Sequence, residues 1–424
     1  MKVLLIGGGG REHALGWKIA RSPRLSKLYL APGSPGLKPL GETLAIGTED
    51  VDALTRAAVD LGVDLVVVGP ETPLASGLAD RLAAAGVACF GPTRGAARLE
   101  SSKAFMKEIA AAAGAPTAAY GRFRDAAGAK AFLRAQHPPY VVKADGLAAG
   151  KGVVIAPSLA EADAAVEDFL GGRFGAASAE IVIEEFMEGE EASFFALCDG
   201  RRVLPLIAAQ DHKRAFDGDT GPNTGGMGAY SPAPVFDDAA RRAAIADIIE
   251  PVVAEMARRG HPYRGVLYAG LMIGPSGPRL VEFNARFGDP ECQVLMRRLD
   301  SDILPALFAA AAGDLSGVAL DWSENAAALV VLAAKGYPGA YAKGAPIGGL
   351  ERAARLPGVV VFHAGTEERA GALVSSGGRV LNVTATGATI RDAVERAYAG
   401  VDAIDFPGGF CRRDIGWRAL ERTR

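Results

Sequence analysis

The sequence has few cysteines and histidines and no large excess of either charge. Its four cysteines and five histidines lie far apart, without the closely spaced pairs of a zinc site or a disulfide framework. A net charge of -3 gives no basic surface for nucleic acid or an anionic membrane. Small molecules are therefore the expected partners, with no nucleic acid and no membrane.

Long hydrophobic runs are also missing. The longest, residues 326–334, is too short to cross a membrane, and the apolar start at residues 2–6 is too short for a signal peptide. We therefore expect a cytoplasmic protein, and we expect it to be a monomer. A chain of 424 residues exceeds what one hydrophobic core usually supports, which predicts about two to four domains.

The N-terminal part has an α/β pattern. Short apolar runs at residues 2–6, 27–30, 65–68 and 87–90 alternate with helical stretches. This alternation is typical of a parallel sheet with helices on its faces.

From about Ser101 the pattern changes to α+β. Strands are predicted at residues 140–144, 153–156, 181–186 and 280–286, and a new series of short strands follows residue 322. The sequence thus predicts an α/β and α+β multidomain protein with a small C-terminal α+β domain.

A glycine-rich turn, residues 7–16, joins the first strand to the first helix. A helix N-terminus in this setting can bind phosphate. The turn fails the dinucleotide pattern, because Glu12 and His13 occupy the final glycine positions and no acid ends the second strand. We predict a phosphate or ribose-phosphate site, with a plain tight turn as the alternative.

Residues 141–156 predict a phosphate-binding flap. Two strands are joined by a loop rich in glycine and alanine, with Lys143 on the first strand and Lys151 in the loop. This is not a P-loop, because the glycine spacing is too short, Gly152 replaces the Ser or Thr, and no helix follows. Backbone amides and ammonium groups would bind triphosphate oxygens, whereas an ordinary hairpin with surface lysines is the alternative.

The acidic strand end at residues 181–193 fits an interdomain hinge whose backbone reads adenine and whose carboxylate accepts ribose hydroxyls. A solvated strand edge is the alternative for these acids. Later in the chain, a glycine-rich loop at residues 219–232 carries Asn223 and Thr224, and its small residues suit close backbone approach to a compact substrate.

Residues 279–291 contain the predicted strand 280–286, whose alternation predicts chemistry on one face. Glu282, Asn284 and Arg286 would share that face, while the residues between them, Val281, Phe283 and Ala285, would pack on the other. Carboxylate and amide oxygens suit Mg²⁺ that bridges ATP phosphates, and a guanidinium could stabilise charge on a transferring phosphoryl group. A solvated polar face is the alternative.

Together these motifs resemble the phosphoribosylamine–glycine ligase family of the ATP-grasp superfamily. The likeness covers essentially the whole chain and is carried by VLLIGGGGREHALGWK, LESSKAF, VVKADGLAAGKGV, IEEFMEGEEAS, QDHKR, GPNTGGMGAYSPAP and EFNARFGDPE. The resemblance implies a ligase of purine biosynthesis. It would form glycinamide ribonucleotide from 5-phosphoribosylamine, glycine and ATP through glycyl phosphate, with Mg²⁺ or Mn²⁺.

The resemblance also implies roles for individual residues. The nucleotide would contact Lys103, Lys143, Gly146, Gly150, Lys151, Gly152, Glu184, Glu185, Met187 and Glu191. Glu282 and Asn284 would bind the metal. Phosphoribosylamine would meet Gly9, Gly10 and Glu71, while glycine and its acyl phosphate would meet Asp211, Lys213, Asn223, Thr224 and Arg286. Of these, Asp211, Lys213 and Arg286 would be catalytic.

The implied domains are an N-terminal phosphoribosylamine-binding domain of the pre-ATP-grasp type at residues 1–102, an ATP-grasp domain at 103–325 with a lid at about 121–192, and a C-terminal domain at 326–424. Two positions depart from the family pattern. Ala285 replaces the usual cysteine, and the strand containing YAGLMI lacks the acid that many superfamily members have there. Metal coordination would then depend on phosphate oxygens and water.

Three rival functions remain open at this point. Another ATP-grasp enzyme, such as a carboxylase acting on a purine intermediate or a biotin carboxylase, would use bicarbonate instead of glycine. A dinucleotide-binding oxidoreductase is disfavoured by the glycine pattern. An inactive ATP-binding regulator is disfavoured because Lys143, Glu282, Asn284 and Arg286 are all present.

Overall fold

The N-terminal sheet is parallel, as the alternation of strands and helices predicts. The computed structural model describes residues 1–148 and 152–422. The sheet has the order β3-β2-β1-β4-β5, and the strands are Lys2–Gly7 (β1), Lys27–Pro32 (β2), Glu42–Thr43 (β3), Leu65–Val68 (β4) and Ala88–Phe90 (β5). The helices of this region are Gly10–Ile19 (α1), Val51–Asp60 (α2), Glu71–Ala75 (α3), Leu78–Ala84 (α4) and Arg94–Ser101 (α5). The inner strands β1 and β4 are almost wholly aliphatic and buried, as expected for a sheet covered on both faces.

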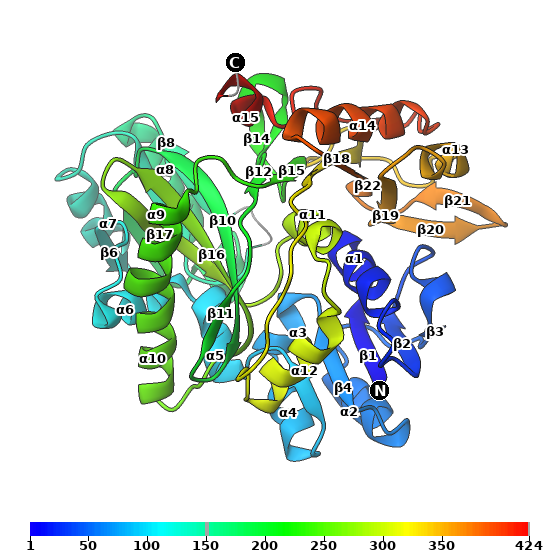
Figure 1. Ribbon diagram of the computed structural model, residues 1–424. Coiled ribbons are helices and arrows are strands. Elements are labelled where there is room, and N and C mark those ends of the chain that lie inside the picture. Colours follow the sequence, from blue (N-terminus) through cyan, green and yellow to red (C-terminus); the bar gives the residue numbers. More distant parts are fainter. Residues whose placement is uncertain (149–151, 423–424) are drawn as a thin grey trace.

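Two antiparallel sheets form the middle of the chain (Figure 1). The lid sheet has the order β6-β9-β7-β8, with strands Tyr120–Phe123 (β6), Tyr140–Ala144 (β7), Val153–Ala156 (β8) and Ile181–Glu184 (β9). Its core forms where helices Ala126–Leu133 (α7) and Leu159–Leu170 (α8) pack on the sheet. The central sheet has the order β11-β10-β16-β17, with strands Glu190–Asp199 (β10), Val203–Pro205 (β11), Arg264–Gly274 (β16) and Gly277–Asn284 (β17).

Helices connect the central sheet to its neighbours. The helices concerned are Lys103–Ala113 (α6), Asp238–Ala243 (α9), Glu250–Arg258 (α10), Glu291–Arg298 (α11) and Ile303–Ala312 (α12). Residues of α11 and α12 share one hydrophobic core with β1, β4 and β10, so the N-terminal and central sheets pack as one body. None of the helices in the described part of the chain is both long and apolar enough to cross a membrane.

The third large sheet joins two distant parts of the sequence. Its order is β12-β15-β18-β22-β19, and β23 pairs with β18. The strands are Gln210–Asp211 (β12), Gly228–Ser231 (β15), Ala326–Ala334 (β18), Val359–His363 (β19), Arg379–Gly387 (β22) and Gly409–Phe410 (β23). Helix Ile390–Asp402 (α14) covers it, and helix Trp417–Arg422 (α15) ends the described chain. Because β12 and β15 belong to this sheet, the glycine-rich loop between them is fixed against the C-terminal region (Figure 1).

The remaining described strands form two small two-stranded antiparallel sheets. They are Arg214–Phe216 (β13) with Thr220–Asn223 (β14), and Thr366–Arg369 (β20) with Ala372–Ser375 (β21). Helix Leu350–Ala354 (α13) precedes the second pair. The first pair forms the base of the glycine-rich loop.

Two histidines, His13, which is buried, and His363, which is half-buried, join the N-terminal region to the C-terminal sheet. His13 on α1 accepts a hydrogen bond at Nδ1 from the backbone N–H of His363 at 2.8 Å, and the two rings lie 5.5 Å apart. Burial lowers the pKa of His13 to about 3, with His363 adding to the effect, and burial lowers the pKa of His363 to about 4. Both rings are therefore neutral in the folded protein at neutral pH.

This pair predicts a loss of stability in acid. The unfolded chain binds protons on these histidines near pH 6.5 and the folded chain does not, so the free energy of unfolding decreases as the pH falls below 6.5. We expect a loss of about 1–2 kcal/mol for each histidine at pH 5. In His13→Asn, the amide oxygen can replace Nδ1 as the hydrogen-bond acceptor. Denaturant unfolding between pH 6.5 and 5 should then show that the free energy of unfolding depends less steeply on pH, because about one proton fewer is taken up on unfolding. If the free energy of unfolding of His13→Asn depended on pH as steeply as that of the wild type, His13 could not be the neutral histidine that causes the loss of stability.

Candidate active site

A cavity of about 560 Å³ lies where the lid, the central sheet, the N-terminal region and the C-terminal region meet. Fifteen of the residues singled out from the sequence line it. They are Glu71, Lys103, Lys143, Gly152, Glu184, Glu185, Met187, Glu191, Asp211, Lys213, Asn223, Thr224, Glu282, Asn284 and Arg286. Residues from distant parts of the chain thus converge on one site.

Three other predicted glycines lie away from the cavity lining. Gly9 precedes α1, and its N–H donates to the carboxylate of Glu12 at 2.7 Å, so the helix N-terminus already holds an anion of the chain itself. Gly10 packs against the C-terminal sheet, where an added Cβ would lie 1.9 Å from Nδ2 of Asn382. Gly146 donates to the carbonyl of Ala177 at 2.9 Å. Gly150 and Lys151 lie outside the described residues.

Lysines from α6 and β7 gather at one end of the cavity. Lys143 donates to Oε2 of Glu184 at 2.9 Å, and Lys107 lies 3.2 Å from the same oxygen. Burial lowers the pKa of Lys103, which the carboxylate of Glu282 partly offsets. Lys107 was not expected from the sequence, although it follows Lys103 by one helical turn, and such a spacing places both side chains on one face of the helix.

The end of β9 forms a junction between polar and apolar surfaces. Glu185 is ion-paired with Arg279 of β17 and accepts a hydrogen bond from the N–H of Ala119. Apolar side chains of Val141, Ile155 and Met187 line the cavity beside it. A planar base could pack between such side chains, with the strand end offering backbone donors and acceptors.

The strand with the predicted metal ligands contains a β-bulge. Gly270 pairs with Glu282 and Leu271 pairs with Leu280, which leaves Val281 as the extra residue. The prediction that Val281 packs on the apolar face is therefore wrong, because the bulge breaks the alternation and Val281 lines the cavity. Phe283 and Ala285 are buried in the core as expected, although Phe283 also contributes to the cavity lining.

Glu282 and Asn284 both line the cavity. Neither side chain has a hydrogen bond or ion pair with any residue in the described parts of the chain. Within those parts no cluster of three His, Cys, Asp or Glu could hold a metal on its own. Two hard oxygen donors fit a divalent cation whose remaining ligands are phosphate oxygens and water.

Asp211, Lys213 and Glu191 form a half-buried charged cluster beside these residues. Nζ of Lys213 lies 2.8 Å from Asp211 and 3.2 Å from Glu191. Burial lowers the pKa of Lys213, but the two carboxylates more than offset this and hold the pKa well above its usual range. Burial raises the pKa of Glu191, which Lys213 opposes. Lys213 is therefore a fixed cation at the cavity wall.

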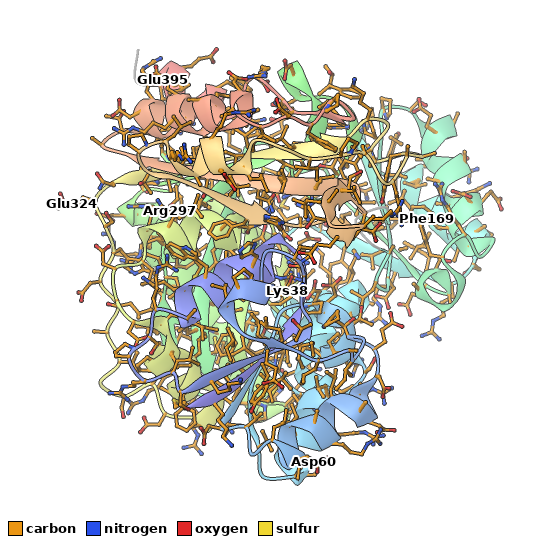
Figure 2. The ribbon with its side chains drawn as sticks, turned by 90° about the vertical axis from the view of Figure 1, so that its right-hand side faces the viewer. Lys38, Asp60, Phe169, Arg297, Glu324 and Glu395 are labelled. Carbon is orange, nitrogen blue, oxygen red and sulfur yellow. The ribbon has the colours of Figure 1, made fainter. Side chains whose placement is uncertain are left out.

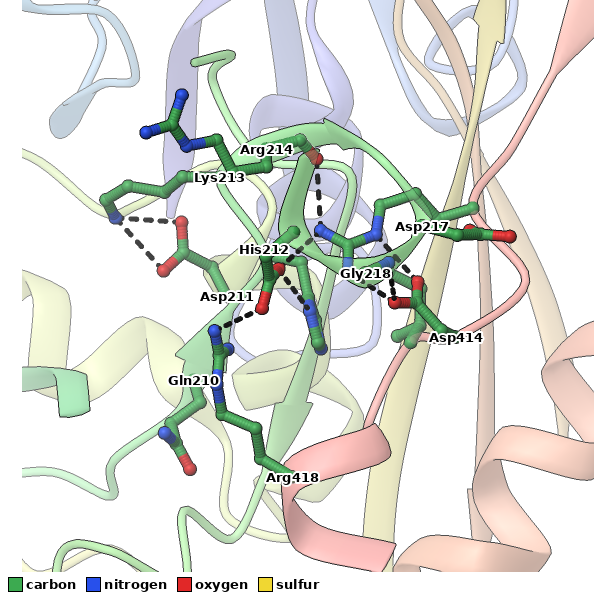
Figure 3. Close-up of polar contacts among 12 residues, drawn as sticks. Gln210, Asp211, His212, Lys213, Arg214, Asp217, Gly218, Asp414 and Arg418 are labelled. Atoms are coloured by element: carbon green, nitrogen blue, oxygen red, sulfur yellow. Dashed lines mark hydrogen bonds and ion pairs between the residues drawn. The ribbon is translucent and has the colours of Figure 1, made fainter. Parts of the chain in front are cut away.

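His212 points away from this cluster and fixes its backbone (Figure 3). Its Nε2 accepts the N–H of Gly416 at 2.9 Å, so the proton of the neutral ring is on Nδ1, which faces Asp219 at 3.8 Å. Asp219 also binds Arg412 at 2.8 Å and Arg418. The C-terminal segment thus holds the strand of Asp211 and the base of the glycine-rich loop in place.

Thr224 fixes the tip of the glycine-rich loop. Its hydroxyl and its backbone N–H both donate to the carbonyl of Lys213, at 2.9 and 2.7 Å. Arg379 of β22 donates to the carbonyls of Gly225 and Asp289 at 2.7 and 2.6 Å, and it also lines the cavity. No local pattern in the sequence pointed to Arg379, because it stands alone in an ordinary strand.

Arg286 lies between two acids of the N-terminal region. Its guanidinium is 3.4 Å from Glu71 and 3.0 Å from Glu100. Burial acts to lower the pKa of Arg286, but the carboxylates raise it above its usual range. Glu100 was also missed, although it lies within the LESSKAF motif, and it accepts the N–H of Ala285 at 2.7 Å. The guanidinium is therefore held rigidly in the cavity.

Comparison with known proteins identifies the family. Family models of phosphoribosylglycinamide synthetase match residues 1–100 (N domain), 101–292 (ATP-grasp domain) and 327–418 (C domain). The chain belongs to the phosphoribosylglycinamide synthetase family. A phosphoribosylamine–glycine ligase of Caulobacter vibrioides is 59% identical over 100% of this chain and 99% of that protein, and one of Rhizobium meliloti is 57% identical with the same coverage.

Solved structures agree with this family. The phosphoribosylamine–glycine ligase of Thermotoga maritima has a TM-score of 0.84 and 32% identity, covering 98% of this chain and 100% of that one. A biotin carboxylase from Campylobacter jejuni has a TM-score of 0.74 at 15% identity, covering 99% and 95%. The second likeness shows the shared fold alone. The match to the ATP-grasp domain of this family implies the use of ATP.

Proposed function

We propose that this chain joins glycine to 5-phosphoribosylamine at the expense of ATP, giving glycinamide ribonucleotide, ADP and phosphate in purine biosynthesis. The observation that supports this most strongly is the convergence of Lys143, Glu282, Lys213 and Arg286 on one cavity. One cavity then contains cations that can bind phosphates, hard oxygens that can bind a metal, and fixed charges that can bind a small zwitterion.

The nucleotide occupies the end of the cavity between the lid and the central sheet. Lys103 and Lys143 bind its phosphates, the strand end at Glu184, Glu185 and Met187 reads the base, and Glu191 accepts ribose hydroxyls. By the motif alone, Gly150, Lys151 and Gly152 are proposed to contribute to phosphate binding. Glu282 and Asn284 would hold Mg²⁺ or Mn²⁺, which would neutralise charge on the phosphate oxygens.

Glycine binds next to the charged cluster. Asp211 accepts its ammonium group, and Lys213 and Arg286 attract its carboxylate, with Asn223 and Thr224 closing the site. A carboxylate oxygen attacks the γ-phosphorus and ADP leaves, which forms glycyl phosphate. The amine of phosphoribosylamine, held near Glu71, then attacks the carbonyl carbon and inorganic phosphate departs. Arg286 stabilises charge on the phosphoryl oxygens in both steps.

The other assignments from the sequence stay proposals. Domain limits at residues 102 and 325, a lid at about 121–192, a cytoplasmic location and a monomer are proposed. A role for Gly9 and Gly10 toward phosphoribosylamine is supported by the motif alone, because neither glycine lines the cavity.

Isotope transfer tests this reaction. With ¹⁸O in the carboxylate of glycine, the label should appear in released phosphate, because the amine expels the bridging oxygen together with phosphorus. Mass spectrometry of phosphate after turnover with freshly prepared phosphoribosylamine measures this. Bicarbonate in place of glycine is the control and should support no ADP release. Unlabelled phosphate alongside product would exclude the acyl phosphate, and bicarbonate-dependent turnover would favour a carboxylase.

A further inference from the structure

Two buried lysines share one carboxylate oxygen at the nucleotide end of the cavity. Nζ of Lys143 and Nζ of Lys107 lie 2.9 and 3.2 Å from Oε2 of Glu184, and the side chains of the three residues are at most 5% exposed. One negative charge is thus balanced by two positive charges inside the protein. A single lysine would be enough to neutralise the carboxylate, so the second lysine adds a positive charge that Glu184 alone does not balance.

The two lysines differ in how firmly they are held. Lys107 also donates to the hydroxyl of Thr117 at 2.8 Å, and that hydroxyl donates to the carbonyl of Leu280 at 2.7 Å. Lys143 lines the cavity, and Glu184 is its only hydrogen-bond or ion-pair partner among the described residues. Lys107 is therefore fixed between α6 and β17, whereas Lys143 can turn toward a ligand by giving up one interaction.

If Lys143 turned toward a phosphate, the buried carboxylate of Glu184 would lose one of its two cations. Its negative charge would then have to be balanced by another group. Breaking a buried ion pair by removing one partner is strongly unfavourable, because the remaining charge is neither hydrated nor paired. We propose that Lys107 is the resident counter-ion of Glu184, which allows Lys143 to exchange its bond to Glu184 for one to the phosphates of ATP. Lys107 is a positioning residue, since it acts through Glu184 and Lys143.

The surroundings of Lys107 support this exchange. The charged groups that face it are Glu184 of β9, Lys143 of β7 and Arg279 of β17, and the ring of Tyr120 on β6 lies 5.5 Å from its Nζ. Burial lowers the pKa of Lys107 to about 8, with Lys143 and Arg279 adding to the effect and Glu184 opposing it. When Lys143 moves away and phosphates arrive, protonated Lys107 is favoured. ATP affinity should then decrease as the pH rises above about 8.

Calorimetric titration with ATP and Mg²⁺ tests the proposal, which depends on the proposed role of Lys143 in ATP binding. Lys107→Met should raise the Kd for ATP about 10- to 100-fold, because Glu184 then retains Lys143. In a Glu184→Gln background, which removes the charge to be compensated, the same change should raise the Kd less than about 3-fold. Lys130→Met is the control, because Lys130 pairs with Glu167 on the lid at 2.7 Å, away from the cavity.

The pH dependence provides a second readout that needs no variant. For the wild type, the Kd for ATP should increase between pH 8 and 9.5. In Lys107→Met the slope of log Kd against pH should be smaller by up to one, because the proton on Lys107 is no longer linked to binding. A wild-type Kd that stays flat would overturn the proposal, and so would an equal loss of affinity from Lys107→Met in the wild-type and Glu184→Gln backgrounds. Failure of the wild type to bind ATP would instead overturn the proposed function, and the inference with it.

Discussion

Replacing Glu282 by alanine is expected to lower kcat about 100-fold or more while the protein remains folded. Glu282 projects into the cavity from β17 and makes no hydrogen bond or ion pair with the described residues. Its removal therefore breaks no hydrogen bond and no ion pair among the described residues of the free protein. During turnover, however, it would remove one of only two protein oxygens proposed to hold the metal against the phosphates.

Steady-state kinetics at ordinary and raised Mg²⁺, with thermal unfolding of both proteins, measure this effect. Raised Mg²⁺ should restore part of the activity, because a weaker site fills at higher metal concentration. Glu324→Ala is the control, since Glu324 is exposed at the outer edge of the molecule (Figure 2). Wild-type turnover of Glu282→Ala at ordinary Mg²⁺ would rule out the metal assignment.

Replacing Arg286 by lysine is expected to lower kcat about 100-fold, with a change of less than about 3-fold in the Kd for ATP. Nε of the guanidinium lies 3.4 Å from Glu71 and Nη2 lies 3.0 Å from Glu100. An ammonium keeps the charge, but it is shorter and lacks the planar fork that matches the oxygens of a phosphoryl group. One buried acid would also lose its partner, so we expect the free energy of unfolding to fall by about 1–3 kcal/mol.

Single-turnover kinetics, ATP titration and denaturant unfolding separate these effects. Arg297→Lys is the matched control, because Arg297 is a half-buried arginine that donates to the carbonyl of Gly358 outside the cavity. It should leave kcat unchanged. If Arg286→Lys turned over at the wild-type rate, the charge alone would suffice and the role of the fork in phosphoryl transfer would be refuted.

Local sequence was a good guide wherever burial is periodic. The aliphatic runs at β1 and β4 predicted a parallel sheet, because only strands covered on both faces are apolar throughout. The short strand β3, Glu42–Thr43, escaped prediction, since two polar, exposed residues carry no periodic signal and pair only because β2 is beside them. Motif residues such as Asp211 and Lys213 were found because several stand together in one stretch.

The sequence by itself determined the fold class, the family resemblance and fifteen of the residues that line the cavity, because these depend on short patterns within single segments. Tertiary structure alone decided that Val281 bulges into the cavity, that Gly10 packs against Asn382, and that Lys107 shares a carboxylate with Lys143. The physical reason is the same in each case. A bulge, a close backbone contact and a buried counter-ion are each formed by two segments that are far apart in the sequence. Which segments lie side by side is decided only when the sheets have assembled.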